Sequence, residues 1–134
     1  MYFYSRTVDS LGSETMPAGM PLLINADRNA ATGWAGFDFA VERSADDSSV
    51  WLTKYAKTEH GTGAWTRIAK VDAYASGNQL HLAIPRSALG MKPGQETFDF
   101  KWVDHQTRPD DVMDFYLSGD VAPDARFCYR FDGR

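Results

Sequence analysis

The stretch WTRIAKVDAYASGNQLHLAIP, from Trp65 to Pro85, decides the fold that the sequence predicts. Its centre, Ser76-Gly77-Asn78, is a turn signal between two extended runs. The run after the turn places apolar side chains at alternate positions, namely Leu80, Leu82 and Ile84. Because successive side chains of a strand point to opposite faces, this spacing predicts a hairpin arm with one face turned inward. His81, between two of these leucines, is then expected to point outward.

The arm before the turn, Trp65–Ala75, is longer. Its alternation of apolar and polar residues slips near Ile68. An extra residue in one strand of a pair produces such a slip, so we expect a single long strand with a β-bulge near Ile68.

The same period of two recurs along the rest of the chain, and roughly eight short strands separated by loop signals predict an all-β protein, an antiparallel β-sandwich of the jelly-roll kind. Besides the hairpin, the expected strands are Tyr2–Tyr4, Pro21–Ala26, Phe37–Glu42, Val50–Tyr55, Thr97–Val103 and Phe127–Phe131, with one helical turn at Pro85–Gly90. We expect one continuous core between the two sheets, formed by Phe37, Phe39, Val41, Leu80, Leu82, Ile84, Phe98, Phe100 and Trp102.

Length and charge bound the kinds of partner. The 134 residues suit one domain, residues 1–134, and the formal net charge is −4. An acidic chain without a basic run makes nucleic acid an unexpected partner. No apolar stretch reaches the ~20 residues of a membrane span, so no membrane partner is expected. A strand starting at Tyr2 suggests a piece of a larger protein, or a sandwich lacking a short N-terminal strand; the alternative is an edge strand at a natural terminus.

Four phrases in order carry a family resemblance: PLLINADRNAATGWAGFDFAVER from Pro21, GNQLHLAIPRSALG from Gly77, FDFKWVDH from Phe98, and DFYLSGDVAPDARFCYRF from Asp114. Together they cover Pro21 to Phe131 and are similar to domains of the family 9 carbohydrate-binding-module type, related to DOMON domains. The resemblance implies a β-sandwich, non-catalytic sugar binding, and a place in a larger secreted or periplasmic bacterial protein that acts on polysaccharides. Some relatives bind haem.

The loop NADRNAATGWAGFDF, Asn25 to Phe39, carries candidate metal ligands. Asp27, Asn29 and Asp38 bring oxygen atoms of the kind that calcium prefers, and members of the resembled family carry structural calcium. The loop does not follow the EF-hand pattern, because Ala31 occupies a position where an acidic residue would stand. The alternative is that Asp27 and Asn29 form Asx turns, in which the side chain accepts a backbone amide.

Tryptophans are the candidate sugar contacts, because the apolar C–H face of a sugar ring stacks on a flat aromatic ring. Trp34 stands in a polar, glycine-flanked loop, so we expect it to be the stacking platform, with Trp65 or Trp51 as the second wall. The alternative for Trp34 is that it folds inward and closes the end of the sandwich.

A second polar cluster follows the strand at Thr97–Val103, and its members are Asp104, His105, Arg108, Asp110, Asp111, Asp114, Asp120 and Asp124. It suits a second cation site, a groove lining, or a solvated loop in which Asp110 or Asp111 caps a helical turn. Asp104 and Asp120 form a conceivable carboxylate pair, but no catalytic motif accompanies them, so no enzyme activity is expected.

The sequence therefore favours a non-catalytic carbohydrate-binding module. One alternative is a structural spacer that docks against neighbouring domains of the same polypeptide. The other is a haem-binding domain, with a methionine among Met16, Met20, Met91 and Met113 and a histidine or lysine as axial ligands. A binding module is expected to present two aromatic side chains near one concave surface, and a spacer is expected to present a flat apolar patch.

Overall fold

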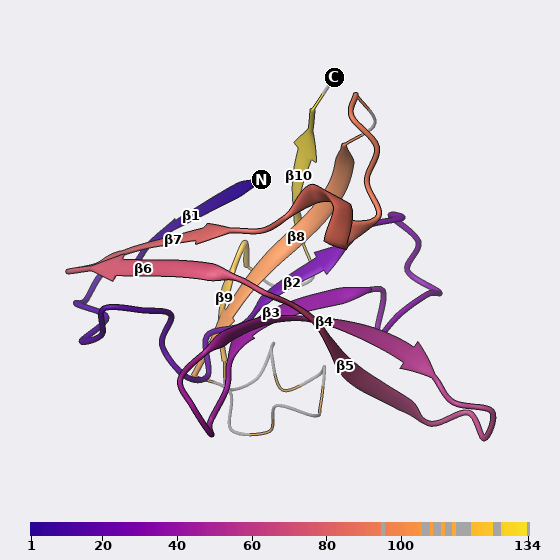
Figure 1. Cartoon of the computed structure of the whole chain (residues 1–134), viewed down its shortest axis with the longest axis horizontal. Helices are drawn as coiled ribbons and strands as arrows, with labels where there is room; N and C mark the ends of the chain where they lie inside the picture. Colours follow the sequence, from indigo (N-terminus) through magenta and orange to yellow (C-terminus); the bar gives the residue numbers. More distant parts are fainter. Residues whose placement is uncertain are drawn as a thin grey trace.

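Two antiparallel sheets pack against each other in the computed structural model (Figure 1). The structure describes residues 1–94, 96–105, 108, 111, 114, 119–124 and 127–133. The smaller sheet has the order β1-β7-β6; the larger has the order β10-β8-β2-β3-β4-β5, with β9 also paired to β8. The strands are β1 (Tyr2–Arg6), β2 (Leu22–Asn25), β3 (Phe39–Arg43), β4 (Val50–Lys57), β5 (Gly63–Lys70), β6 (Asp72–Ser76), β7 (Gln79–Ala83), β8 (Thr97–Asp104), β9 (Asp120–Ala122) and β10 (Tyr129–Asp132). The predicted all-β antiparallel sandwich is confirmed.

The predicted hairpin is the pair β6–β7, joined by Gly77 and Asn78. Leu80 and Leu82 point into the space between the sheets and are fully buried, whereas His81 lies exposed on the outer face. The predicted helical turn is the 3₁₀ helix η1 (Arg86–Leu89), which ends at Gly90 in a left-handed conformation. Local alternation and turn chemistry were therefore sufficient to predict this part of the fold.

The predicted long strand Trp65–Ala75 is wrong in one respect, because it is two strands in different sheets. β5 belongs to the larger sheet and β6 to the smaller one, and the chain crosses between them at the buried Val71. The bulge near Ile68 is confirmed: Arg67 pairs with Thr53 and Ala69 with Leu52, which leaves Ile68 as the extra residue.

The main core fills the space between the sheets and contains seven of the predicted residues: Phe39, Val41, Leu80, Leu82, Ile84, Phe98 and Trp102. Phe100 packs against this core while partly buried. The prediction for Phe37 is wrong: Phe37 is buried, but in a second cluster with Leu23, Ala40 and Val103. The reason is that β3 begins only at Phe39, and the backbone before it turns Phe37 away from the sandwich interior.

Both β9 and β10 pair with β8, at neighbouring positions along it. Ala122 pairs with Trp102 and Tyr129 pairs with Phe100, so Lys101 alone lies opposite the whole intervening segment. The Lys101 side chain is 1% exposed, and its Nζ donates hydrogen bonds to the carbonyl oxygens of Pro123 and Phe127. This buried ammonium ties the backbone at Pro123 and at Phe127 to the larger sheet.

Candidate functional site

The loop between β2 and β3 ends in a tight turn that aims two aromatic side chains at the larger sheet. Trp34 and Phe37 exchange backbone hydrogen bonds of 2.8 and 3.0 Å. The two residues between them, Ala35 and Gly36, both have positive φ, as a type I′ turn requires. Gly33 approaches the turn so closely that a Cβ there would lie 2.1 Å from the Phe37 carbonyl oxygen, so only glycine fits. Residues facing each other across such a turn share one face, which places Trp34 beside Phe37.

These two aromatics cover the outer face of the larger sheet, on the side away from the smaller sheet. Phe37 is buried there with Leu23, Ala40 and Val103, and Trp34 and Trp65 pack against this cluster while half-buried. Trp34 therefore neither stands free at a loop tip nor closes the end of the sandwich between the sheets.

Trp34 and Trp65 lie together, which is the pairing that the sequence predicted as one of two possibilities. Their ring centroids are 6.1 Å apart in an edge-to-face arrangement, and the Tyr55 ring lies 5.2 Å from that of Trp65. Tyr55 is directly opposite Trp65 across β4 and β5. A Cβ at Gly63 would lie 1.7 Å from the Tyr55 hydroxyl oxygen, so Gly63 makes room for the phenol ring. Sequence reasoning missed Tyr55, although it shares the alternate positions of Trp51.

Trp51 lies on the same outer face, but its neighbours are basic side chains and not the rings of Trp34 and Trp65. Arg67 and Lys70, both on β5, place their cationic groups 5.2 and 5.4 Å from the centroid of the Trp51 ring. The Trp51 indole Nε1 is buried and has no hydrogen-bond partner among the residues that the structure describes. Glu42 is opposite Trp51 on β3; desolvation raises the pKa of its carboxyl, and Arg67 lowers it in part. The Trp51 ring is thus flanked by cations instead of forming a wall with Trp34.

The predicted metal ligands in the same loop hold the backbone. Asp27 Oδ1 accepts the amide of Asn29 at 2.8 Å, and Asn29 Oδ1 accepts the amide of Ala31 at 3.0 Å, so both residues form Asx turns. Asp38 Oδ2 accepts the amide of Ala26 at 2.8 Å. Amide hydrogens point at these oxygens, and calcium needs six to eight oxygens that converge on one point. The hydrogen bonds favour the Asx-turn interpretation, and calcium binding stays a prediction.

The Asx turns predict that Asp27→Ala lowers the free energy of unfolding by about 0.5–1.5 kcal/mol, the usual value for a lost hydrogen bond. The loss should be equal in calcium and in chelator, as measured by thermal unfolding. Asp27→Asn is the matched control, since asparagine retains an Asx acceptor but not the charge. A wild-type melting temperature that rises with calcium, with the rise absent in both variants, would instead establish a cation site.

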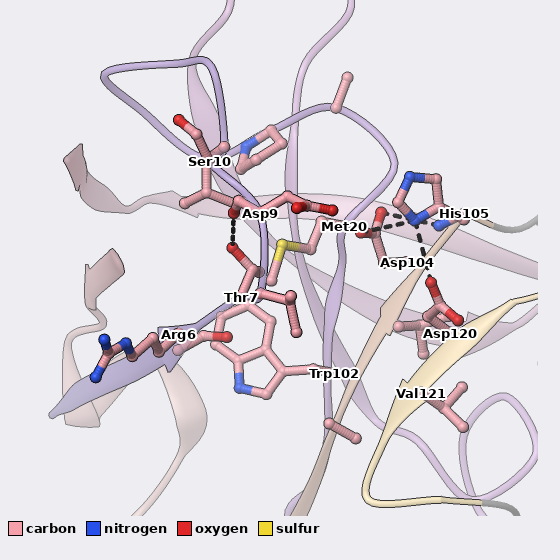
Figure 2. A pocket seen from close by; sticks show the side chains of 17 residues that line it. Arg6, Thr7, Asp9, Ser10, Met20, Trp102, Asp104, His105, Asp120 and Val121 are labelled. Atoms are coloured by element: carbon pink, nitrogen blue, oxygen red, sulfur yellow. Dashed lines mark hydrogen bonds and ion pairs between the residues drawn. The ribbon is translucent and has the colours of Figure 1, made fainter. Parts of the chain in front are cut away.

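The described residues form a concave pocket elsewhere, between the loop after β1 and the ends of β8 and β9. Figure 2 shows this pocket, whose volume is about 660 Å³, with Arg6, Asp9 and Trp102 among its lining residues. Trp102 is only 5% exposed, so it offers no free ring face to a ligand. The pocket therefore lacks the exposed aromatic pair that a sugar site needs.

The rim of this pocket contains the carboxylate pair that the sequence suggested. Asp104 and Asp120 are paired across β8 and β9, and His105 Nδ1 lies 3.0 Å from Asp104 Oδ2 and 3.4 Å from Asp120 Oδ2 (Figure 2). The side chains of His105 and Asp120 are 74% and 85% exposed. These contacts are ion pairs only when His105 is protonated, and exposed ion pairs contribute about 0–1 kcal/mol, so the group favours the solvated-loop interpretation.

The rest of the predicted polar cluster is described only in part. The Asp114 carboxylate is buried, and its Oδ2 accepts the amide of Arg108 at 2.7 Å. Asp110 and Met113 lie outside the described residues, so the predicted helix cap at Asp110 is not addressed. Of the suggested haem ligands, Met16 and Met20 are buried in the main core.

Comparison of the chain with protein-family models, with curated proteins and with solved structures gave no match. The structure itself defines the class of protein: an antiparallel β-sandwich with aromatic side chains on the outer face of its larger sheet. Within the described part of the chain, no helix is long and apolar enough to cross a membrane.

Proposed function

We propose that this protein is a non-catalytic carbohydrate-binding module, of the family 9 type that its sequence phrases resemble, and that sugar binds at the outer face of the larger sheet. The observation that carries the proposal is the meeting of Trp34, Trp65 and Tyr55, which come from a loop and two strands. The Asx turns and the close fit at Gly33 and Gly63 hold these rings in place before a ligand arrives. A prearranged aromatic surface lowers the entropic cost of binding a flexible glycan.

The chemistry of the surface suits a sugar better than a purely apolar ligand. Half-buried aromatic rings offer apolar area to the C–H faces of sugar rings, while the Tyr55 hydroxyl and the tryptophan N–H groups supply polar atoms at the ring edges. No member of this set is a strong acid or base, which agrees with binding and not with bond cleavage.

Replacement of Trp65 or Trp34 by alanine should weaken glycan binding by roughly tenfold or more, about 1.4 kcal/mol or more, because each removes a ring face. Titration of neutral and acidic oligosaccharides, followed by tryptophan fluorescence, measures the loss. Tyr74→Ala is the control, since Tyr74 is 62% exposed on the smaller sheet. Trp65→Phe keeps a smaller ring and should give an intermediate affinity even if an alanine variant folds poorly. Wild-type affinity in both alanine variants would contradict the proposed site.

A second candidate function is docking against a neighbouring domain, and one observation favours it. The outer face of the smaller sheet exposes Tyr2, Tyr4 and Tyr74, at 88%, 52% and 62%, and Tyr4 and Tyr74 flank His81 on the two neighbouring strands. Such an array is typical of a surface that another protein covers. If no glycan binds in the titrations, the docking function through this face is favoured instead.

A further inference from the structure

The hairpin β4–β5 has a charge that differs from that of the rest of the protein. Residues 50–70 contain Lys54, Lys57, Arg67 and Lys70 but only one acidic residue, Glu59, while the whole chain has a net charge of −4. The hairpin is therefore a positive element, with a net charge of +3, in a protein that is otherwise negative.

Most of these cations share a face with the aromatic site. Leu52 points into the main core, so the alternate positions Trp51, Thr53, Tyr55 and Lys57 face outward. Across the strand pair, Lys70 is opposite Trp51, Arg67 is opposite Thr53, and Trp65 is opposite Tyr55. Aromatic rings and cations therefore alternate along one continuous surface that runs from Trp65 to Trp51.

The cations of this surface lack strong internal partners. Arg67 Nη2 donates to the neutral Ser44 hydroxyl at 2.9 Å, and within the described ranges neither Arg67 nor Lys70 forms an ion pair. Glu42 and Asp47 act on Arg67 and Lys70 electrostatically, but neither carboxylate lies within ion-pair distance of them. The side chains of Arg67 and Lys70 are both exposed, so two accessible cations can receive an incoming carboxylate, which accepts charge-assisted hydrogen bonds strongly.

We propose that the outer face of β4–β5 binds an acidic carbohydrate, with Trp65 and Tyr55 contacting the sugar rings and with Arg67 and Lys70 receiving a sugar carboxylate. This inference rests on the proposed carbohydrate-binding function and names its ligand class. A stacked nucleobase fits less well, because Arg67 and Lys70 already lie over the Trp51 ring, and the net charge of the protein repels a long phosphate backbone.

The experiment compares oligomers of galacturonic acid with the same oligomers after methyl esterification, which removes the charge but keeps the sugar. Binding to the full chain is measured by calorimetry at two salt concentrations. We expect esterification, and separately the double variant Arg67→Gln/Lys70→Gln, to weaken binding roughly tenfold to hundredfold, the change that lost charge-assisted hydrogen bonds bring. Lys92→Gln, an exposed lysine of another loop, is the control that should bind as wild type does. Thermal unfolding verifies that each variant folds.

The outcomes separate the two proposals. Equal affinity for the acid and the ester would overturn the inference while leaving carbohydrate binding intact. Absence of binding to every oligosaccharide in the panel would overturn both. Single-stranded DNA bound as tightly as the acidic oligomers would also overturn the inference, because the surface would then recognise polyanions irrespective of the sugar.

Discussion

Leu82→Ala lowers the free energy of unfolding by about 2–5 kcal/mol, the range measured when a fully buried leucine is truncated. Leu82 is 1% exposed and lies in the main core, on the strand between β1 and β6. Removing its side-chain carbons leaves a cavity between the two sheets that neighbouring side chains fill only in part. Urea unfolding should show a lower midpoint with an unchanged m value, since the surface exposed on unfolding is nearly the same.

His81→Ala is the matched control, because His81 is the next residue on the same strand and points outward. Its ring centroid lies 5.0 Å from that of Tyr4, a surface contact, so we expect a change within about 0.5 kcal/mol. Equal losses at the two positions would mean that β7 is not buried on one face only, and the sandwich would then be wrong in this region.

We expect Lys101→Met to cause the second large decrease in the free energy of unfolding. Methionine keeps an apolar stem of similar length but donates no hydrogen bond, so the carbonyl oxygens of Pro123 and Phe127 lose the donor that holds them. A hydrogen bond to a charged group contributes about 1.5–3 kcal/mol, so losing these two partly buried bonds should lower the free energy of unfolding by at least about that amount. Burial lowers the pKa of Lys101, while Cys128 and Asp124 raise it in part, as expected for an ammonium held in a poorly solvated place.

Amide hydrogen exchange distinguishes this effect from a general loss of stability. In Lys101→Met, amides of β9 and β10 should exchange faster relative to those of β7, because Pro123 and Phe127 are no longer hydrogen-bonded to β8 through Lys101. Lys92→Met, at an exposed position, should change neither stability nor exchange. Wild-type stability in Lys101→Met would show that other contacts hold Pro123 and Phe127 against the sheet.

Much of the fold could be predicted because alternation is a local property of a strand. The pairing partner of a strand is not local, and this explains the errors. Alternation says nothing about the sheet to which each half belongs, so the crossing at Val71 was missed. β9 is a three-residue strand with little apolar pattern, so it had no detectable signal.

The candidate site, like the fold, was predictable where the signal is local and not where it depends on strand pairing. Trp34 was predicted as a sugar contact from its polar, glycine-flanked loop, which stays a prediction, and Trp65 was one of two expected neighbours and does lie beside it. The separation of Trp51 from them depends on the register of β4 against β5, including the bulge at Ile68, which fixes the residues opposite each ring. The aromatic and cationic surface is thus a property of the strand pair that neither strand shows alone.

The order in which the strands pair affects how the chain folds while it is being synthesised. β3, β4 and β5 are consecutive neighbours and can pair as soon as each is made, but β1 pairs with β7 and β2 with β8. During synthesis, Leu22, Leu23 and Ile24 thus gain one neighbour early and wait for the other until residue 104 has left the ribosome. Long loops must close before these contacts form, so such topologies fold in about milliseconds to seconds, not in microseconds. The apolar β2 segment consequently keeps one unpaired edge for most of synthesis, and such an edge is prone to chaperone binding and to aggregation.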